Sequence, residues 1–263
     1  MLAIYTREMK SYIKTLLIWV ICVSGLGLMC ILMYSGMQEE MAEMADGFAS
    51  MGAFSEAFGM SQLSLATLIG FYATEIGNIH GLGGAMFAAI IGTALLSKEE
   101  DGHTSEFLFT LPISRGKVVV AKCLSAVSFV TIFNVVSVMV YVLGFIIVGE
   151  EIPTEEFVLF HVMQLVMQLQ IAIVCFAISA FMKKNKFGIG LGVALLFYAY
   201  DMIARVIPDI SDSKFLSPYS YANAADILSG VEIYKTGLIV GIVMMVVCLG
   251  ISYVIYTRRD LAA

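Results

Sequence analysis

Six long apolar runs divide this chain and place the strongest limit on what it can fold into. They cover residues 15–36, 76–97, 122–148, 157–182, 187–207 and 236–257. Each run has about the 18 or more residues that a helix needs to cross roughly 30 Å of hydrocarbon. Because lipid cannot hydrogen-bond the backbone, and because the runs are not short alternating strands, we expect helices. The sequence therefore predicts an all-α membrane protein, one transmembrane domain of six helices over residues 1–263.

The composition agrees with this prediction. Hydrophobic residues make up 60% of the chain and charged residues only 14%. A soluble protein of this size carries about 25% charged residues. We therefore expect a multi-pass protein of a prokaryotic cell membrane, surrounded by lipid.

The basic residues predict the orientation of the six helices. Those that fall on one side are Arg7, Lys10, Lys14, Lys98, Arg115, Lys117, Lys122, Lys183, Lys184, Lys186, Arg258 and Arg259. They are twelve of the 15 lysines and arginines, and loops rich in such residues stay in the cytoplasm. Both termini are thus predicted to be cytoplasmic. The net charge of −6 arises mostly from acids in the opposite loops, and no basic face indicates a nucleic-acid partner.

Residues 38–60 contain large apolar side chains at spacings of three and four, which predicts an amphipathic helix. Met41, Met44, Phe48 and Met51 form the apolar stripe, with acidic residues between them. Such a helix would lie on the outer leaflet or cap the bundle. Alternatively it would form an outer gate over an exit path, because methionine gives an adaptable surface for varied apolar cargo.

Polar residues within the predicted spans have two interpretations. Asp201 and Arg205 stand at i and i+4, the order that favours an ion pair; His161, Gln164 and Gln168 form one polar stripe. Buried polar groups in membranes mark functional paths, but they also hydrogen-bond neighbouring helices. A structural role and a role along a cargo path both remain open for these residues.

The sequence contains no motif of a catalytic protein. There is no phosphate-binding loop of the form G-x-x-x-x-G-K-[ST] and no H-E-x-x-H zinc motif. We therefore expect a chain that is not an enzyme, holds no metal or cofactor, and cannot hydrolyse ATP itself.

Residues 97–117 are polar between two apolar runs, and residues 99–122 read EEDGHTSEFLFTLPISRGKVVVAK. This stretch resembles the permease subunits of type-2 ABC exporters, which carry an acidic start, a Thr-x-Glu step, a Leu-Pro-[Ile/Val]-Ser-Arg turn and a later lysine. The matching residues are Glu99, Glu100, Thr104, Glu106, Phe107, Leu108, Leu111, Pro112, Ser114, Arg115 and Lys122. Residues 216–219 and 258–261 also look like segments of that family.

The resemblance implies a function. In such exporters the segment between spans two and three forms a cytoplasmic coupling helix in a groove of a separate ABC ATPase, present in two copies, which binds ATP and Mg²⁺. Glu99 to Arg115 would make this contact, with Pro112 ending the helix and Ser114 capping the next one. Residues 1–14 resemble the family's interfacial helix. A second permease copy, or a related permease, would complete the exporter of an amphipathic or hydrophobic cargo: a peptide, an antibiotic or a lipid-like molecule.

Two other classes of function remain open at this stage. Asp201, Gln164 and Gln168 would carry protons or ions if the chain were a secondary transporter. A non-transporting assembly or sensor subunit of the membrane is the second alternative, and it predicts no ATPase partner.

Overall fold

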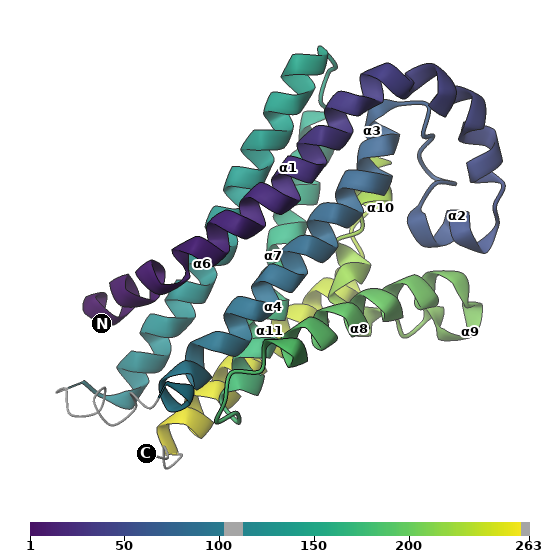
Figure 1. The fold of residues 1–263 in the computed structure, drawn as a ribbon. Helices are drawn as coiled ribbons and strands as arrows, with labels where there is room; N and C mark the ends of the chain where they lie inside the picture. The colour runs from purple at the N-terminus through teal and green to yellow at the C-terminus, as the bar shows by residue number, and fades with distance from the viewer. Residues whose placement is uncertain (103–112, 259–263) are drawn as a thin grey trace.

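A computed structural model describes residues 1–102 and 113–258, and within them the regular structure is helical. Six stretches of this part are long and apolar enough to cross a membrane. They are α1 (Leu2–Ala49), the continuous stretch Leu68–Asp101, α6 (Arg115–Val148), α7 (Thr154–Ser179), α8 (Phe187–Val206) and α11 (Lys235–Arg258). Each corresponds to one predicted apolar run. The two termini lie at the same end of the bundle (Figure 1), as an even number of spans requires.

The second span lies at the centre of the bundle. It begins as α3 (Leu68–Phe71), passes through the π-helical turn η1 (Tyr72–Ile76) and continues as α4 (Gly77–Asp101). Helix α4 contacts α1, α6, α7 and α8, and Figure 1 shows it running through the middle of the fold. A movement of α4 would therefore change its contacts with four other helices.

Glycines on α4 allow this close packing. A Cβ atom at Gly84 would lie 2.2 Å from Nε2 of Gln168, and one at Gly92 would lie 2.3 Å from the carbonyl oxygen of Ala172. Both neighbours belong to α7. Small residues let membrane helices approach closely, which gains van der Waals contact where no hydrophobic driving force exists between helices. This is why α4 and α7 form an extensive interface.

The predicted separate helix over residues 38–60 is not seen, because α1 continues without a break to Ala49. A short helix α2 (Ala53–Phe58) follows. The last turns of α1 bend away from the bundle towards α2 (Figure 1). In the predicted stripe, Met41 and Phe48 are partly buried against apolar clusters, whereas Met44 and Met51 are about half exposed, at 45% and 52%.

Residues 2–14, predicted as an interfacial helix, are likewise the first turns of α1. The helix is 48 residues long, which is far more than a bilayer requires. The sequence does not mark where α1 enters and leaves the membrane. A helix without Pro or a capping residue has no reason to stop at the membrane boundary.

The chain between α8 and α11 folds back onto the bundle through short helices. These are α9 (Pro208–Ser211), η2 (Lys214–Leu216), η3 (Pro218–Tyr221) and α10 (Ala224–Leu228). Asn223 caps α10 by accepting a hydrogen bond from the backbone N–H of Asp226, at 3.0 Å. Tyr219 and Tyr221 are buried, and burial raises the pKa of both phenols, so they stay protonated.

Candidate functional site

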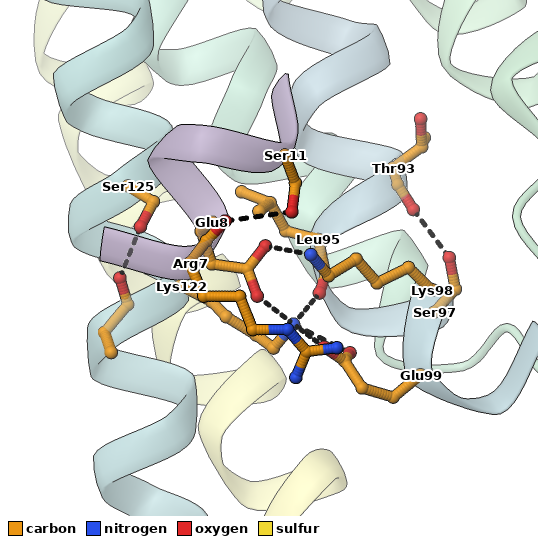
Figure 2. Close-up of polar contacts among 11 residues, drawn as sticks. Arg7, Glu8, Ser11, Thr93, Leu95, Ser97, Lys98, Glu99, Lys122 and Ser125 are labelled. Carbon is orange, nitrogen blue, oxygen red and sulfur yellow. Dashed lines mark hydrogen bonds and ion pairs between the residues drawn. The ribbon is translucent and has the colours of Figure 1, made fainter. Parts of the chain in front are cut away.

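A cluster of four charges, three of them buried, lies at the end of the bundle that holds both termini. Glu8 comes from α1, Lys98 and Glu99 from the end of α4, and Lys122 from α6. Figure 2 shows the four side chains converging between the three helices. Glu8 and Glu99 are each 1% exposed and Lys122 is completely buried.

The amino group of Lys122 is the centre of this cluster. It donates to Oε1 and Oε2 of Glu99, each at 2.7 Å, and to Oε1 of Glu8 at 3.1 Å. It also donates to the backbone carbonyl of Leu95. Oε2 of Glu8 forms an ion pair with Lys98. Two positive and two negative charges therefore balance, as buried ionic groups must.

The cluster brackets the predicted coupling segment. Its members Glu99 and Lys122 lie on either side of residues 103–112, which are outside the described part of the structure. Thr104, Glu106, Phe107, Leu108, Leu111 and Pro112 all fall there. Glu99 and Glu100 are buried rather than displayed on the surface. Glu99 thus ties the start of the segment to Lys122 on the helix that follows it.

Helix α6 begins at Arg115, as predicted. The prediction that the Ser114 side chain caps it was wrong: Ser114 holds the cap position in extended conformation, but its hydroxyl does not cap the helix. The first turn of α6 instead contacts the end of α11. Nη1 of Arg115 lies 3.5 Å from the carbonyl oxygen of Thr257, and a Cβ at Gly116 would lie 2.7 Å from the Tyr253 hydroxyl.

A second polar region lies within the bundle, between α4, α6 and α7. His80 hydrogen-bonds Oδ1 of Asn134 at 3.1 Å and the Tyr141 hydroxyl at 3.3 Å. Asn134 donates to Oε1 of Gln168 at 2.8 Å, and Gln168 donates to the carbonyl of His80 at 3.3 Å. The ring of contacts joins three helices where hydrocarbon would leave each group unsatisfied.

The other two members of the predicted polar stripe, His161 and Gln164, also form hydrogen bonds with groups from other segments. His161 hydrogen-bonds the Tyr72 hydroxyl at 2.8 Å, and Nε2 of Gln164 donates to the carbonyl of Ala222 at 2.7 Å. His161, Gln164 and Gln168 are 6%, 2% and 0% exposed. The structure thus brings the predicted stripe together as a set of contacts between helices, which favours the structural interpretation over an open path.

Asp201 and Arg205 form the ion pair predicted from their spacing, with Nε of Arg205 2.8 Å from Oδ2 of Asp201. Arg205 also binds Oδ2 of Asp226 at 3.1 Å, which the sequence analysis did not foresee. Asp226 belongs to α10, and so Arg205 fastens the connecting segment to the end of α8.

The sequence analysis did not single out three residues that make buried or bridging polar contacts: Glu8, Asn134 and Asp226. Glu8 carried a usable signal, since it is the one acid among the basic residues of the first turns. Asn134 also carried one, as an amide in the middle of an apolar run. Asp226 gave none, because an acid in a polar connecting segment is ordinary.

Six apolar helices joined by buried polar contacts define a multi-pass membrane protein. A sequence model of the family described as ABC-2 family transporter protein matches residues 2–261. Because this match spans nearly the whole chain, the protein belongs to the ABC-2 transporter family and is a permease component of an ABC transporter. Comparison with curated proteins gives no match. The family confirms the resemblance noted in the sequence, and its members are membrane transport components that in general work with an ABC ATPase.

Proposed function

We propose that this chain is the permease subunit of an ATP-driven exporter that moves an amphipathic or hydrophobic cargo out of the cytoplasm. Two copies of a separate ABC ATPase bind ATP and Mg²⁺, and a second permease copy or a related permease completes the membrane part. The observation that carries this proposal is the family match together with the buried charge cluster that brackets residues 103–112.

The charge cluster would transmit force from the ATPase to the membrane helices. An ATPase that pushes on residues 103–112 acts on the end of α4 and the start of α6. Lys122 and Glu99 hold these two ends together, and Glu8 joins α1 to both. Because α4 also contacts α7 and α8, the bundle would respond as a rigid body, which is the usual mode of such transitions.

We propose that residues 104–111 make the contact with the ATPase, whereas Glu99 and Glu100 are buried within the permease. Glu106 would pair with basic residues of the ATPase, and Phe107, Leu108 and Leu111 would fill its groove. The secondary-transporter alternative has less support, since Asp201 is paired with Arg205 and Gln168 is hydrogen-bonded through both its oxygen and its nitrogen.

The first test is whether a neighbouring reading frame encodes an ATPase with a phosphate loop, and whether the two proteins co-purify. Glu106→Lys and Phe107→Ala should each reduce co-purification and cargo-stimulated ATP hydrolysis. Glu56→Lys and Phe54→Ala are matched controls, because both residues are exposed on α2 and do not belong to the proposed contact. Full complex formation and full coupled ATPase activity in both test variants would refute the coupling contact.

A screen of amphipathic compounds for stimulation of ATP hydrolysis tests the proposed cargo. Stimulation by amphipaths and not by small polar solutes would support it. A flat response to every amphipath, in a complex that still hydrolyses ATP, would refute this cargo class while leaving the ATPase contact intact.

A further inference from the structure

A small polar cavity of about 30 Å³ lies at the other end of the bundle, away from the termini. It is lined by α2, η1, α4, α7, α8 and residues 219–225. Its polar lining consists of Asn78, Gln164, Tyr198, Asp201, Tyr219 and Asn223. A cavity needs about 10–15 Å³ to hold one water molecule, so this cavity has room for about two water molecules or ions of similar size.

Two oxygen atoms of the lining have no hydrogen-bond partner: Oε1 of Gln164 and the hydroxyl of Tyr219. Both residues are more than nine-tenths buried, at 2% and 6% exposed. The orientation of Gln164 is set because its Nε2 donates to the carbonyl of Ala222 at 2.7 Å. A buried acceptor left unpaired is costly, and these two atoms therefore indicate a ligand that supplies a partner to each.

The charges around the cavity favour a cation. Arg205 bridges Asp201 and Asp226, so these three groups carry one net negative charge. Asp201 lines the cavity and binds Arg205 through its Oδ2, whereas neither Arg205 nor Asp226 lines the cavity. The next positive group, Lys214, lies over the ring of Tyr234, 4.5 Å from its centroid, and is also absent from the lining.

The oxygen ligands further narrow the kind of cation. The lining offers one carboxylate, the Gln164 carbonyl, the Tyr219 hydroxyl, and Oδ1 of Asn78, which accepts from Tyr198 at 2.9 Å. Hard cations prefer such oxygen ligands. A divalent ion such as Ca²⁺ usually takes six to eight oxygens with several carboxylates, whereas a single carboxylate matches a single positive charge.

We propose that this cavity binds one small monovalent cation of the size of Na⁺, held by the Asp201 carboxylate, Oε1 of Gln164 and the Tyr219 hydroxyl. The bound ion would link α7, α8 and the connecting segment before α10. It would act as a structural ligand that holds α8, whose apolar side chains are largely exposed, against α7 and α4. The inference is independent of the ATPase and of the cargo.

The test uses the full chain purified in detergent, with thermal unfolding measured in NaCl, KCl, LiCl or N-methyl-D-glucamine chloride at equal ionic strength. A ligand that binds only the folded protein raises the unfolding temperature in proportion to ln(1 + [L]/Kd). We expect a saturable rise with Na⁺ that N-methyl-D-glucamine does not produce. Equal unfolding temperatures in all four salts would overturn the proposal and mean that water alone fills the cavity.

A pair of variants tests the location of the site. Tyr219→Phe removes one ligand oxygen while keeping the ring, and should weaken Na⁺ binding about tenfold, measured as uptake of radioactive ²²Na⁺ by the purified protein. Tyr34→Phe is the matched control, because Tyr34 also has a buried, unpartnered hydroxyl but does not line the cavity. Equal Na⁺ affinity in the two variants would overturn the assignment of the site.

Discussion

The two ends of the bundle hold their helices together with different kinds of charge cluster. At the end with the termini, Lys122 is completely buried and Glu8 and Glu99 are each 1% exposed, and Lys98, whose side chain is 18% exposed, completes the balance of charges. At the other end, Arg205 bridges two aspartates, its side chain is 15% exposed, and the Asp226 side chain is 27% exposed.

The difference teaches what each cluster can do. A buried and balanced cluster is strongly destabilised when one member is removed, so it suits a rigid joint. A partly exposed cluster is screened by water and tolerates change. The first cluster therefore suits the transmission of force from residues 103–112, and the second suits the attachment of a connecting segment.

The largest expected effect is that of Lys122→Met. This change leaves Glu8 and Glu99 buried without their shared partner and should lower the free energy of unfolding by about 3–5 kcal/mol, measured by SDS titration in mixed micelles. Lys117→Met, at an exposed position of the same helix, is the control and should change little. A loss from Lys122→Met no larger than that from Lys117→Met would refute the role of the cluster as a joint.

Arg205→Met should have a smaller effect of about 2–3 kcal/mol, because removing a charged hydrogen-bond donor leaves Asp201 buried while Asp226 reaches water. The same SDS titration measures it. Lys235→Met serves as the control, since Lys235 pairs with Glu232 on the surface and its side chain is 77% exposed. A decrease in the free energy of unfolding equal to that caused by Lys122→Met would contradict the proposed difference between the two ends.

The region between the two clusters depends on shape rather than on charge. Gly84→Ala should cost about 1–2 kcal/mol, because the new Cβ would displace the amide of Gln168 from its hydrogen bonds with Asn134 and His80. Gly25→Ala on α1 meets no atom within 4 Å and should be neutral or slightly stabilising. Thermal unfolding of both variants checks this, and equal unfolding temperatures would contradict the packing argument.

The smallest expected effect is that of Asp226→Asn. Arg205 keeps Asp201 as a partner, and the lost ion pair is partly exposed, so the change should be below about 1 kcal/mol. A double-mutant cycle with Arg205→Met measures the coupling between the two residues. A coupling above about 2 kcal/mol would place this cluster in the same class as the buried one.

Much of the architecture follows from local sequence. Helices α8 and α11 begin and end within a residue of the predicted runs, because Pro208 and the polar segments on either side stop them. The ion pair of Asp201 and Arg205 also follows from local spacing, since residues at i and i+4 meet on any helix. The length of α1 does not, because nothing in residues 2–49 terminates the helix where the membrane ends.

The sequence alone predicted the six spans, the uneven distribution of basic residues among the segments that flank them, and the family to which the protein belongs. Each of these depends on local composition or on short motifs. Only the tertiary structure decided that Glu8 meets Lys122 and that Gln164, Asp201 and Tyr219 share one cavity. These residues are far apart along the chain, and they meet because the helices that carry them pack together, with glycines of α4 in close contact with α1 and α7. Local patterns carry no information about such contacts, which arise from how helix faces fit together.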